Sequence, residues 1–256
     1  MRTKVATFCR CVRVWILLPC IATGPVWTAS AQGPDSPDGH GASRVLLIDF
    51  VGGFVHSDDT RHPEVQIVQH LQQRSIPGLE AEVFENSKTS SAEERVLQFL
   101  DENRDGTLST EEKQRAQVIL LGHSWGGGAV MKLVQDLDRR NIPVMLMIEV
   151  DGVGKFAPTS CDVPANVREA MNFYQTKLPI RGCQALHPID PAKTRILANI
   201  RMQYQHQPPE CQALPWQDRW FLRSHNSLGC DPHVWSEVEK QIDIALGTTA
   251  VASASE

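Results

Sequence analysis

One serine of this chain has the surroundings of a catalytic nucleophile. It lies in Gly122-His123-Ser124-Trp125-Gly126, which has the pattern G-x-S-x-G. In this pattern a sharp turn exposes the serine, and the glycines on either side leave room for it. The alternative is a glycine-rich turn that only packs closely or binds a phosphate, but no lysine precedes the serine as it does in a phosphate loop. We therefore interpret Ser124 as a nucleophile.

A serine hydroxyl needs a histidine to take up its proton and an acid to orient that histidine. We expect Asp151 to be the acid, because it follows the apolar segment 144–148 and active sites of open α/β sheets gather at the carboxyl ends of the strands. The non-catalytic alternative for Asp151 is a loop aspartate that caps a turn. Glu149 and Asp190 are the substitutes.

The expected base is His225, in the polar segment Ser224-His225-Asn226-Ser227 shortly before the last apolar-periodic segment. His233 is expected to be an ordinary first-turn residue of that final helix. His123, inside the glycine-rich turn, is expected to pack rather than react. His187 and His206 lie in proline-containing loops and have no positional argument for a catalytic role.

Apolar runs and helical periodicities alternate around these residues. We expect strands at 45–48, 80–84, 118–121, 144–148 and 195–200, and helices that begin at Pro63, at Ala92, directly after Ser124 and near His233. A strand followed by a helix, repeated in this way, predicts a parallel sheet with right-handed crossovers and helices on both faces.

The turn at Ser124, the order of elements and the late histidine resemble the α/β-hydrolase superfamily over residues 44–246. The resemblance implies a three-layer α/β sandwich with a mostly parallel, five- to six-stranded sheet. It also implies the chain order nucleophile, acid, histidine. Many members carry the acid one strand later, whereas thioesterase-like members place it where Asp151 stands.

The same resemblance implies an oxyanion hole, which is a pair of N–H groups that bind the negative oxygen of the tetrahedral intermediate. One donor is expected to be the backbone N–H of Trp125. The other is expected from the turn Val51-Gly52-Gly53-Phe54, through Gly53 or Phe54. The glycines there could instead serve only a tight turn.

A second motif is independent of the first. Residues 101–112 match the calcium-loop pattern D-x-[DN]-x-[DN]-G-x5-E at every fixed position, with Gly106 at the turn, and resemble an EF-hand. The expected oxygen ligands are Asp101, Asn103, Asp105, Thr107 through its carbonyl, Ser109 and Glu112. The alternative is a solvated acidic turn between helices. Because the loop precedes the strand that carries Ser124, we expect a structural calcium ion at the end of the sheet opposite the catalytic residues.

The termini and the cysteines suggest export. Residues 1–31 have basic residues, a short apolar run and Ala29-Ser30-Ala31, as a cleavable signal peptide does; residues 32–43 are expected to be a flexible linker and 247–256 a frayed tail. The apolar run is too short to span a membrane. Four cysteines follow residue 31, and of their three possible pairings the most local is Cys161–Cys183 with Cys211–Cys230. Buried free thiols are the alternative.

The charge argues against nucleic acid as a partner. The chain of 256 residues has a formal net charge of −5, and loss of the four basic and no acidic side chains of residues 1–31 makes the balance −9. We therefore expect a secreted or periplasmic serine hydrolase that acts on a small-molecule or lipid-like ester or thioester, with an amide as a further option. The aromatic segment 208–222 could line an acyl pocket or form a lid. The rival hypothesis is a non-enzymatic calcium-binding protein on a hydrolase-like scaffold, and the oligomeric state stays open.

Overall fold

The computed structural model describes residues 44–156, 158–214 and 223–248. The expected signal peptide, the linker, most of the expected tail and the aromatic residues Trp216, Trp220 and Phe221 lie outside the described residues. None of the helices within the described ranges has the length and apolar character that a membrane span requires.

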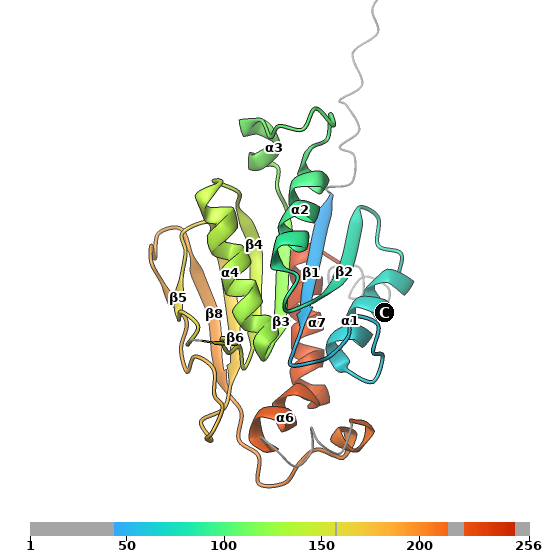
Figure 1. Cartoon of the computed structure of the whole chain (residues 1–256), viewed down its shortest axis with the longest axis vertical. Helices are drawn as coiled ribbons and strands as arrows, with labels where there is room; N and C mark the ends of the chain where they lie inside the picture. Colours follow the sequence, from blue (N-terminus) through green and yellow to red (C-terminus); the bar gives the residue numbers. More distant parts are fainter. Residues whose placement is uncertain (1–43, 157, 215–222, 249–256) are drawn as a thin grey trace, which may run out of the picture. The chain divides into compact units, whose positions relative to one another are not determined.

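A six-stranded parallel sheet forms the centre of the fold (Figure 1). Its strands are β1 (Val45–Val51), β2 (Leu79–Glu85), β3 (Val118–His123), β4 (Val144–Val150), β6 (Val167–Tyr174) and β8 (Arg195–Arg201). They lie in the order β2-β1-β3-β4-β6-β8, and every neighbouring pair is parallel. Two further short strands, β5 (Asp162–Val163) and β7 (His187–Pro188), pair with each other outside this sheet.

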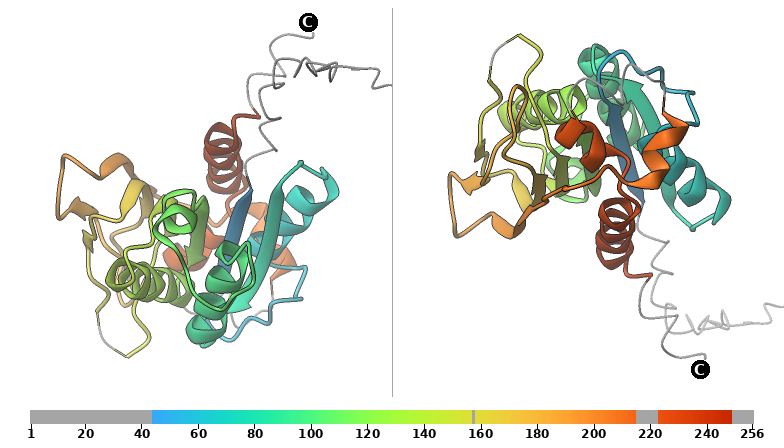
Figure 2. Two further views of the ribbon diagram at one scale, coloured as in Figure 1. Left: turned by 90° about the horizontal axis from the view of Figure 1, so that it is seen from above. Right: turned by 90° about the horizontal axis from the view of Figure 1, so that it is seen from below.

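Helices cover both faces of the sheet, so the expected fold class is confirmed. Helices α2 (Thr89–Leu100) and α4 (Trp125–Arg139) lie on one face, and α1 (Pro63–Gln73) and α7 (Pro232–Leu246) lie on the other (Figure 2). Three short helices complete the described elements: α3 (Thr110–Gln114), the 3-10 helix η1 (Pro209–Ala213) and α6 (Arg223–Gly229).

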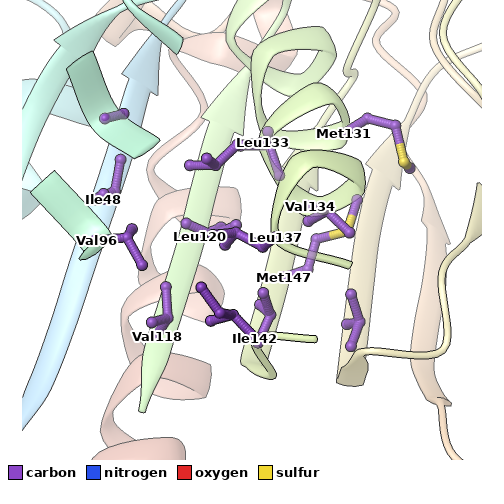
Figure 3. Close-up of a cluster of buried hydrophobic side chains, with 14 of the residues drawn as sticks. Ile48, Val96, Val118, Leu120, Met131, Leu133, Val134, Leu137, Ile142 and Met147 are labelled. Atoms are coloured by element: carbon purple, nitrogen blue, oxygen red, sulfur yellow. The ribbon is translucent and has the colours of Figure 1, made fainter. Parts of the chain in front are cut away.

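The apolar side chains of the strands are divided between two cores, one under each helical layer. Under α4, Leu133 and Leu137 pack on Leu120 of β3 with Ile48 of β1, and all four are fully buried (Figure 3). Burying an aliphatic side chain of this size contributes about 1.5–3 kcal/mol. Because β3 is buried on both faces, its residues form a continuous apolar run. This packing fixes the position of the turn at its end.

Strand β6 was not predicted, and β8 is the sixth strand rather than the fifth. Arg168, Glu169 and Asn172 interrupt the apolar pattern of β6. Asn172 is fully buried, and its side-chain N–H donates to the carbonyl of Cys183 at 2.8 Å, whereas its Oδ1 has no hydrogen-bond partner among the described residues.

Both cysteine pairs of the local prediction form disulfides, and the alternative of free thiols is wrong. The Cα atoms are 5.6 Å apart in Cys161–Cys183 and 5.2 Å apart in Cys211–Cys230. The first bridge closes the loops beyond β4 and β6, and the second joins η1 to the residue that follows α6.

The loop 101–112 lies between α2 and β3, at the amino end of β3, whereas α6 lies at the opposite end of the sheet (Figure 1). Gly106 has the left-handed φ of +81° that the turn requires. Ser109 caps α3, and the Glu112 carboxylate accepts hydrogen bonds from the backbone N–H groups of Ser109 and Glu102. Within the described residues no group of three or more acidic, histidine or cysteine side chains is arranged to hold a metal ion, so calcium binding stays a prediction.

Candidate active site

Ser124 lies in a tight turn between β3 and α4. Its φ of +55° and ψ of −124° are strained values for a residue other than glycine. Its N–H donates to the carbonyl of Val150 at 3.0 Å, and its carbonyl accepts from Val153 at 2.8 Å. A Cβ on Gly126 would lie 1.9 Å from the carbonyl oxygen of Phe50 in β1, so only glycine lets α4 start this close to the sheet. The neighbouring strands therefore lock the strained turn.

The structure brings Ser124, His225 and Asp151 together. His225 Nε2 is 2.7 Å from Ser124 Oγ, and His225 Nδ1 is 2.7 Å from Asp151 Oδ2. The three side chains come from the ends of β3 and β4 and from α6, and the serine and the histidine are 101 positions apart in sequence. All three residues are buried. A nucleophile, a base and an acid in hydrogen-bond contact form the arrangement that nucleophilic catalysis by serine requires.

Asp151 is held by three further features. Its φ is +46°. Its Oδ1 accepts from the N–H of Gly182 at 2.8 Å, and its Oδ2 accepts from the side-chain amide of Gln175 at 2.9 Å. Burial alone would raise the pKa of Asp151, but the hydrogen bonds from His225, Gly182 and Gln175 outweigh it and lower that pKa. The acid is therefore ionised beside the imidazole.

His225 is almost completely enclosed. Burial lowers its pKa, the hydrogen bond with Asp151 opposes that effect, and the charge of the neighbouring His123 adds to it, so that the net pKa lies below the usual value. Since an ionised carboxylate accepts only, Nδ1 carries the proton and Nε2 of the neutral ring is free to accept from Ser124. His225 is thus an unprotonated base at neutral pH.

The predicted surroundings of His225 were wrong in one respect. The segment expected to be a polar loop is the helix α6, and His225 is its third residue. Viewed from below in Figure 2, α6 lies over the carboxyl ends of the strands. Because α6 lies there, His225 is placed over Ser124.

The other histidines and acids lie elsewhere. His187, His206 and His233 are exposed. Asp190 accepts hydrogen bonds within its own loop, from Ala192 and Thr194. Glu149 is fully buried under the glycine turn after β4, and burial together with the charge of Asp151 raises its pKa to about 8. Only His123 lies beside the three residues, with its ring stacked on that of His225.

Three backbone N–H groups near Ser124 have no acceptor among the described residues: those of Gly53, Phe54 and Trp125. Trp125 is the first residue of α4, where N–H groups are free and the helix dipole favours negative charge. Gly53 has a φ of +41°, and its carbonyl accepts from the side-chain amide of Asn86 at 2.7 Å, which fixes the turn after β1. The turn can therefore present its N–H groups to an oxygen bound near Ser124.

A cavity of about 410 Å³ opens at Ser124 and His225. Apolar side chains from four separate segments form part of its wall, contributed by Phe54, Trp125, Ile180 and Leu214. The segment between β1 and α1 forms a polar wall with His56, Asp59, Arg61 and His62. Phe54 is 88% exposed and meets the Trp125 ring edge-on at 5.1 Å, so the two aromatics border the opening.

Sequence reasoning missed several residues that support the site. Gln175 and Gly182 hold Asp151, Asn86 holds the turn after β1, and Glu64 lies 3.4 Å from His123. Of these residues, only Gln175 could have been predicted from the sequence, because it directly follows β6, the strand next to β4. That prediction would have required β6 to be recognised as a strand.

No protein-family model matches the chain, and no curated protein is significantly similar to it in sequence. Among solved structures it is similar to a cutinase-like protein from Cryptococcus sp., with 14% identity over 81% of this chain and 97% of that one and a TM-score of 0.41. It is also similar to dienelactone hydrolase from Anabaena variabilis, with 14% identity, coverages of 80% and 85% and a TM-score of 0.41. The thioesterase RedJ from Streptomyces coelicolor shares 11% identity, with coverages of 84% and 98% and a TM-score of 0.38. Likenesses this distant carry no conclusion about activity.

Proposed function

We propose that this protein is a serine hydrolase that cleaves an ester or thioester through Ser124, His225 and Asp151, as members of the α/β-hydrolase superfamily do. The observation that carries the proposal is the continuous contact from Ser124 Oγ to His225 and from His225 to Asp151, at 2.7 Å for each hydrogen bond. The strained turn at Ser124 and the ionised acid are the further support.

In the first half of the reaction, Ser124 Oγ attacks the carbonyl carbon of the substrate while its proton passes to His225 Nε2. Asp151 keeps the proton on Nδ1 and stabilises the imidazolium that forms. The negative oxygen is bound by the N–H of Trp125 and by that of Gly53 or Phe54. Collapse of the intermediate breaks the bond to the leaving group, which takes the proton from His225, and an acyl-Ser124 remains.

In the second half, a water molecule gives a proton to His225 Nε2 and attacks the acyl carbon. Ser124 leaves with that proton, and the carboxylic acid product departs. The apolar part of the cavity wall suits an acyl chain or other apolar group, which favours a carboxylesterase or lipase, followed by a thioesterase or amidase. The two disulfides suit an exported protein.

Ser124→Ala is expected to lower kcat for a p-nitrophenyl ester by at least about 10³-fold, because the nucleophile is lost while the fold is kept. Ser236→Ala, at an exposed position of α7, is the control and should retain wild-type activity. The measurement is initial rates together with thermal melting of each variant. Ester hydrolysis by folded Ser124→Ala at the wild-type rate would contradict the proposal.

The rival function, a calcium-binding protein without hydrolase activity, is separated from this one by a fluorophosphonate probe. Wild-type protein is expected to be labelled covalently at Ser124, because the probe reacts with serines that a histidine activates. Folded wild-type protein that resists the probe favours the rival.

We also propose that the loop 101–112 binds a structural calcium ion. The donor set is entirely oxygen, which suits this hard cation, and would consist of Asp101, Asn103, Asp105, the Thr107 carbonyl, Ser109 and Glu112. The bound ion would neutralise the acidic side chains and hold α2 against the start of β3. An exported protein meets enough calcium to fill even a weak site of this kind.

A further inference from the structure

A second histidine and a second buried carboxylate lie beside His225, and the reaction steps above use neither. The ring of His123 stacks on that of His225, with centroids 5.3 Å apart and planes inclined by 21°. On its other side, His123 Nδ1 is 3.4 Å from Oε1 of Glu64, in the first turn of α1. An acid and an imidazole thus form a pair directly beside the pair Asp151–His225.

The surroundings of His123 are shaped to receive its ring. A Cβ on Gly229 would lie 2.5 Å from Cε1 of His123, so the last residue of α6 must be glycine for the ring to fit. Trp235 of α7 meets the ring edge-on at 6.4 Å, and its Nε1 donates to the carbonyl of Gly229 at 2.8 Å. Helix α6 therefore touches His123 near both of its ends, through His225 and through Gly229.

Glu64 is built to hold His123 in one orientation. Only 1% of Glu64 is exposed. Burial would raise its pKa, but the hydrogen bond and the charge of His123 outweigh burial and lower that pKa, so the carboxylate is ionised. An ionised carboxylate only accepts, which assigns the proton to Nδ1 of His123. The orientation of the ring is thereby fixed.

Asp49 of β1 is fully buried and close enough to Glu64 for the two carboxyl groups to interact electrostatically. Burial and the charge of Glu64 raise the pKa of Asp49 well above its usual range, so Asp49 keeps its proton. Both oxygens of Asp49 and Oε2 of Glu64 have no hydrogen-bond partner among the described residues. A neutral Asp49 beside an ionised Glu64 avoids two adjacent buried charges.

We propose that His123, held by Glu64, is a positioning residue for the general base: it fixes the plane and the place of the His225 ring by stacking, and so seats α6 over Ser124. The inference rests on the proposed function for its kinetic consequences, although the placement of His225 can be measured without it. Helix α6 needs such a contact because it has only seven residues, too few to be stable as an isolated helix.

The pair also acts on the charge of His225. The groups that face His225 are Asp151 at the end of β4, Ser124 and His123 at the end of β3, and through His123 the carboxylate of Glu64 on α1. Asp49 and His62 interact electrostatically with the carboxylate of Glu64. Among these groups, the charge of His123 lowers the pKa of His225. Replacing His123 by an uncharged ring should therefore raise it.

The test compares His123→Ala, His123→Phe and Glu64→Gln, with the exposed His233→Ala as control. His123→Ala removes the stack, so kcat for a p-nitrophenyl ester should fall by roughly 10- to 100-fold with KM within about twofold, as expected for a misplaced base. His123→Phe keeps the stack and should retain most of kcat, while the acidic limb of the pH profile moves to higher pH. In the double variant Glu64→Gln/His123→Ala, the loss should equal that of His123→Ala alone, because Glu64 acts through His123.

Imidazole resonances of His225, followed by NMR during a pH titration, give a readout that needs no turnover. In protein with Ser124→Ala as background, His123→Phe should raise the measured pKa of His225 and His233→Ala should leave it unchanged. An inert wild-type enzyme with this pKa response would overturn the proposed function and support the positioning role. An unchanged pKa, or wild-type kcat in folded His123→Ala, would overturn the positioning role even if esters are cleaved. Should His123→Ala fail to fold, the pKa of His225 in His123→Phe decides: a raised pKa supports the positioning role and an unchanged pKa overturns it.

Discussion

At the scale of single residues, Glu149 near the end of β4 and Asp151 directly after it differ in charge although they are two positions apart. Asp151 accepts hydrogen bonds from three donors and is ionised. Glu149 has no hydrogen-bond partner within the described residues, and its pKa of about 8 keeps it protonated at neutral pH. This difference in charge favours Asp151 over Glu149 as the acid of the proposed triad, although the sequence allowed either.

Glu149→Gln is expected to stabilise the protein increasingly as the pH rises. The pKa of Glu149 is higher in the folded state, so its contribution to stability is complete below its unfolded pKa of about 4.5 and is lost as pH rises toward about 8. The gain from the neutral glutamine should grow by at most about 1.4 kcal/mol per pH unit over that window. Urea unfolding at pH 5 and pH 8 measures it, with the exposed Glu94→Gln as control. An equal effect at both pH values would argue against a protonated Glu149.

At the scale of elements, the fold depends on how closely α4 approaches β1. Gly126→Ala would place a methyl group inside van der Waals contact with the backbone of Phe50, where neither partner has a flexible end to move. We expect a loss of stability of about 3 kcal/mol or more, at or beyond the upper end of ordinary overpacking. Thermal or urea unfolding measures the loss.

Gly53→Ala is the matched control for that substitution. Its Cβ would meet no atom within 4 Å, so the change costs only the strain of a φ of +41°, about 1–2 kcal/mol. Equal destabilisation of the two variants would show that the approach of α4 to β1 is not the constraint.

Also at the scale of elements, structure that depends on neighbouring residues was predicted from the sequence, whereas contacts between distant segments were missed. The strand, turn and helix around Ser124 have strong local patterns, so they were predicted correctly. Helix α6 was expected to be a loop because its serine, asparagine and glycine are poor helix formers. Tertiary contacts with His123 and the bridge at Cys230 stabilise it instead.

The partners of Asp151 were missed for the same reason. Gly182 and Gln175 are 31 and 24 residues away in sequence, and both depend on the path of β6. Polar residues within that strand hid its apolar pattern. Hydrogen bonds between distant segments leave no trace in local periodicity, so the network around the acid required the structure.

At the scale of the whole molecule, the expected metal loop and Ser124 lie at opposite ends of β3. If calcium binds only the folded state, its removal lowers stability by about 2.7 kcal/mol at a concentration 100 times Kd. We therefore expect EDTA to lower the melting temperature and Asp101→Ala to abolish this response. Asp138→Ala, at an exposed position of α4 outside the loop, should keep it. A melting curve that EDTA leaves unchanged would contradict a structural calcium site.

The hydrogen bond between Gln175 and Asp151 has a consequence for how such sites can change over evolutionary time. One carboxylate oxygen, Asp151 Oδ2, lies 2.9 Å from the tip of Gln175 and 2.7 Å from the imidazole, so the ends of β4 and β6 converge on a single point. Glutamine and glutamate codons differ by one nucleotide. A lineage that acquired glutamate at position 175 would hold a second acid next to the first, and Asp151 could then be lost without leaving His225 unsupported. Mutation can therefore move the acid from the end of β4 to the end of β6 while the fold stays the same.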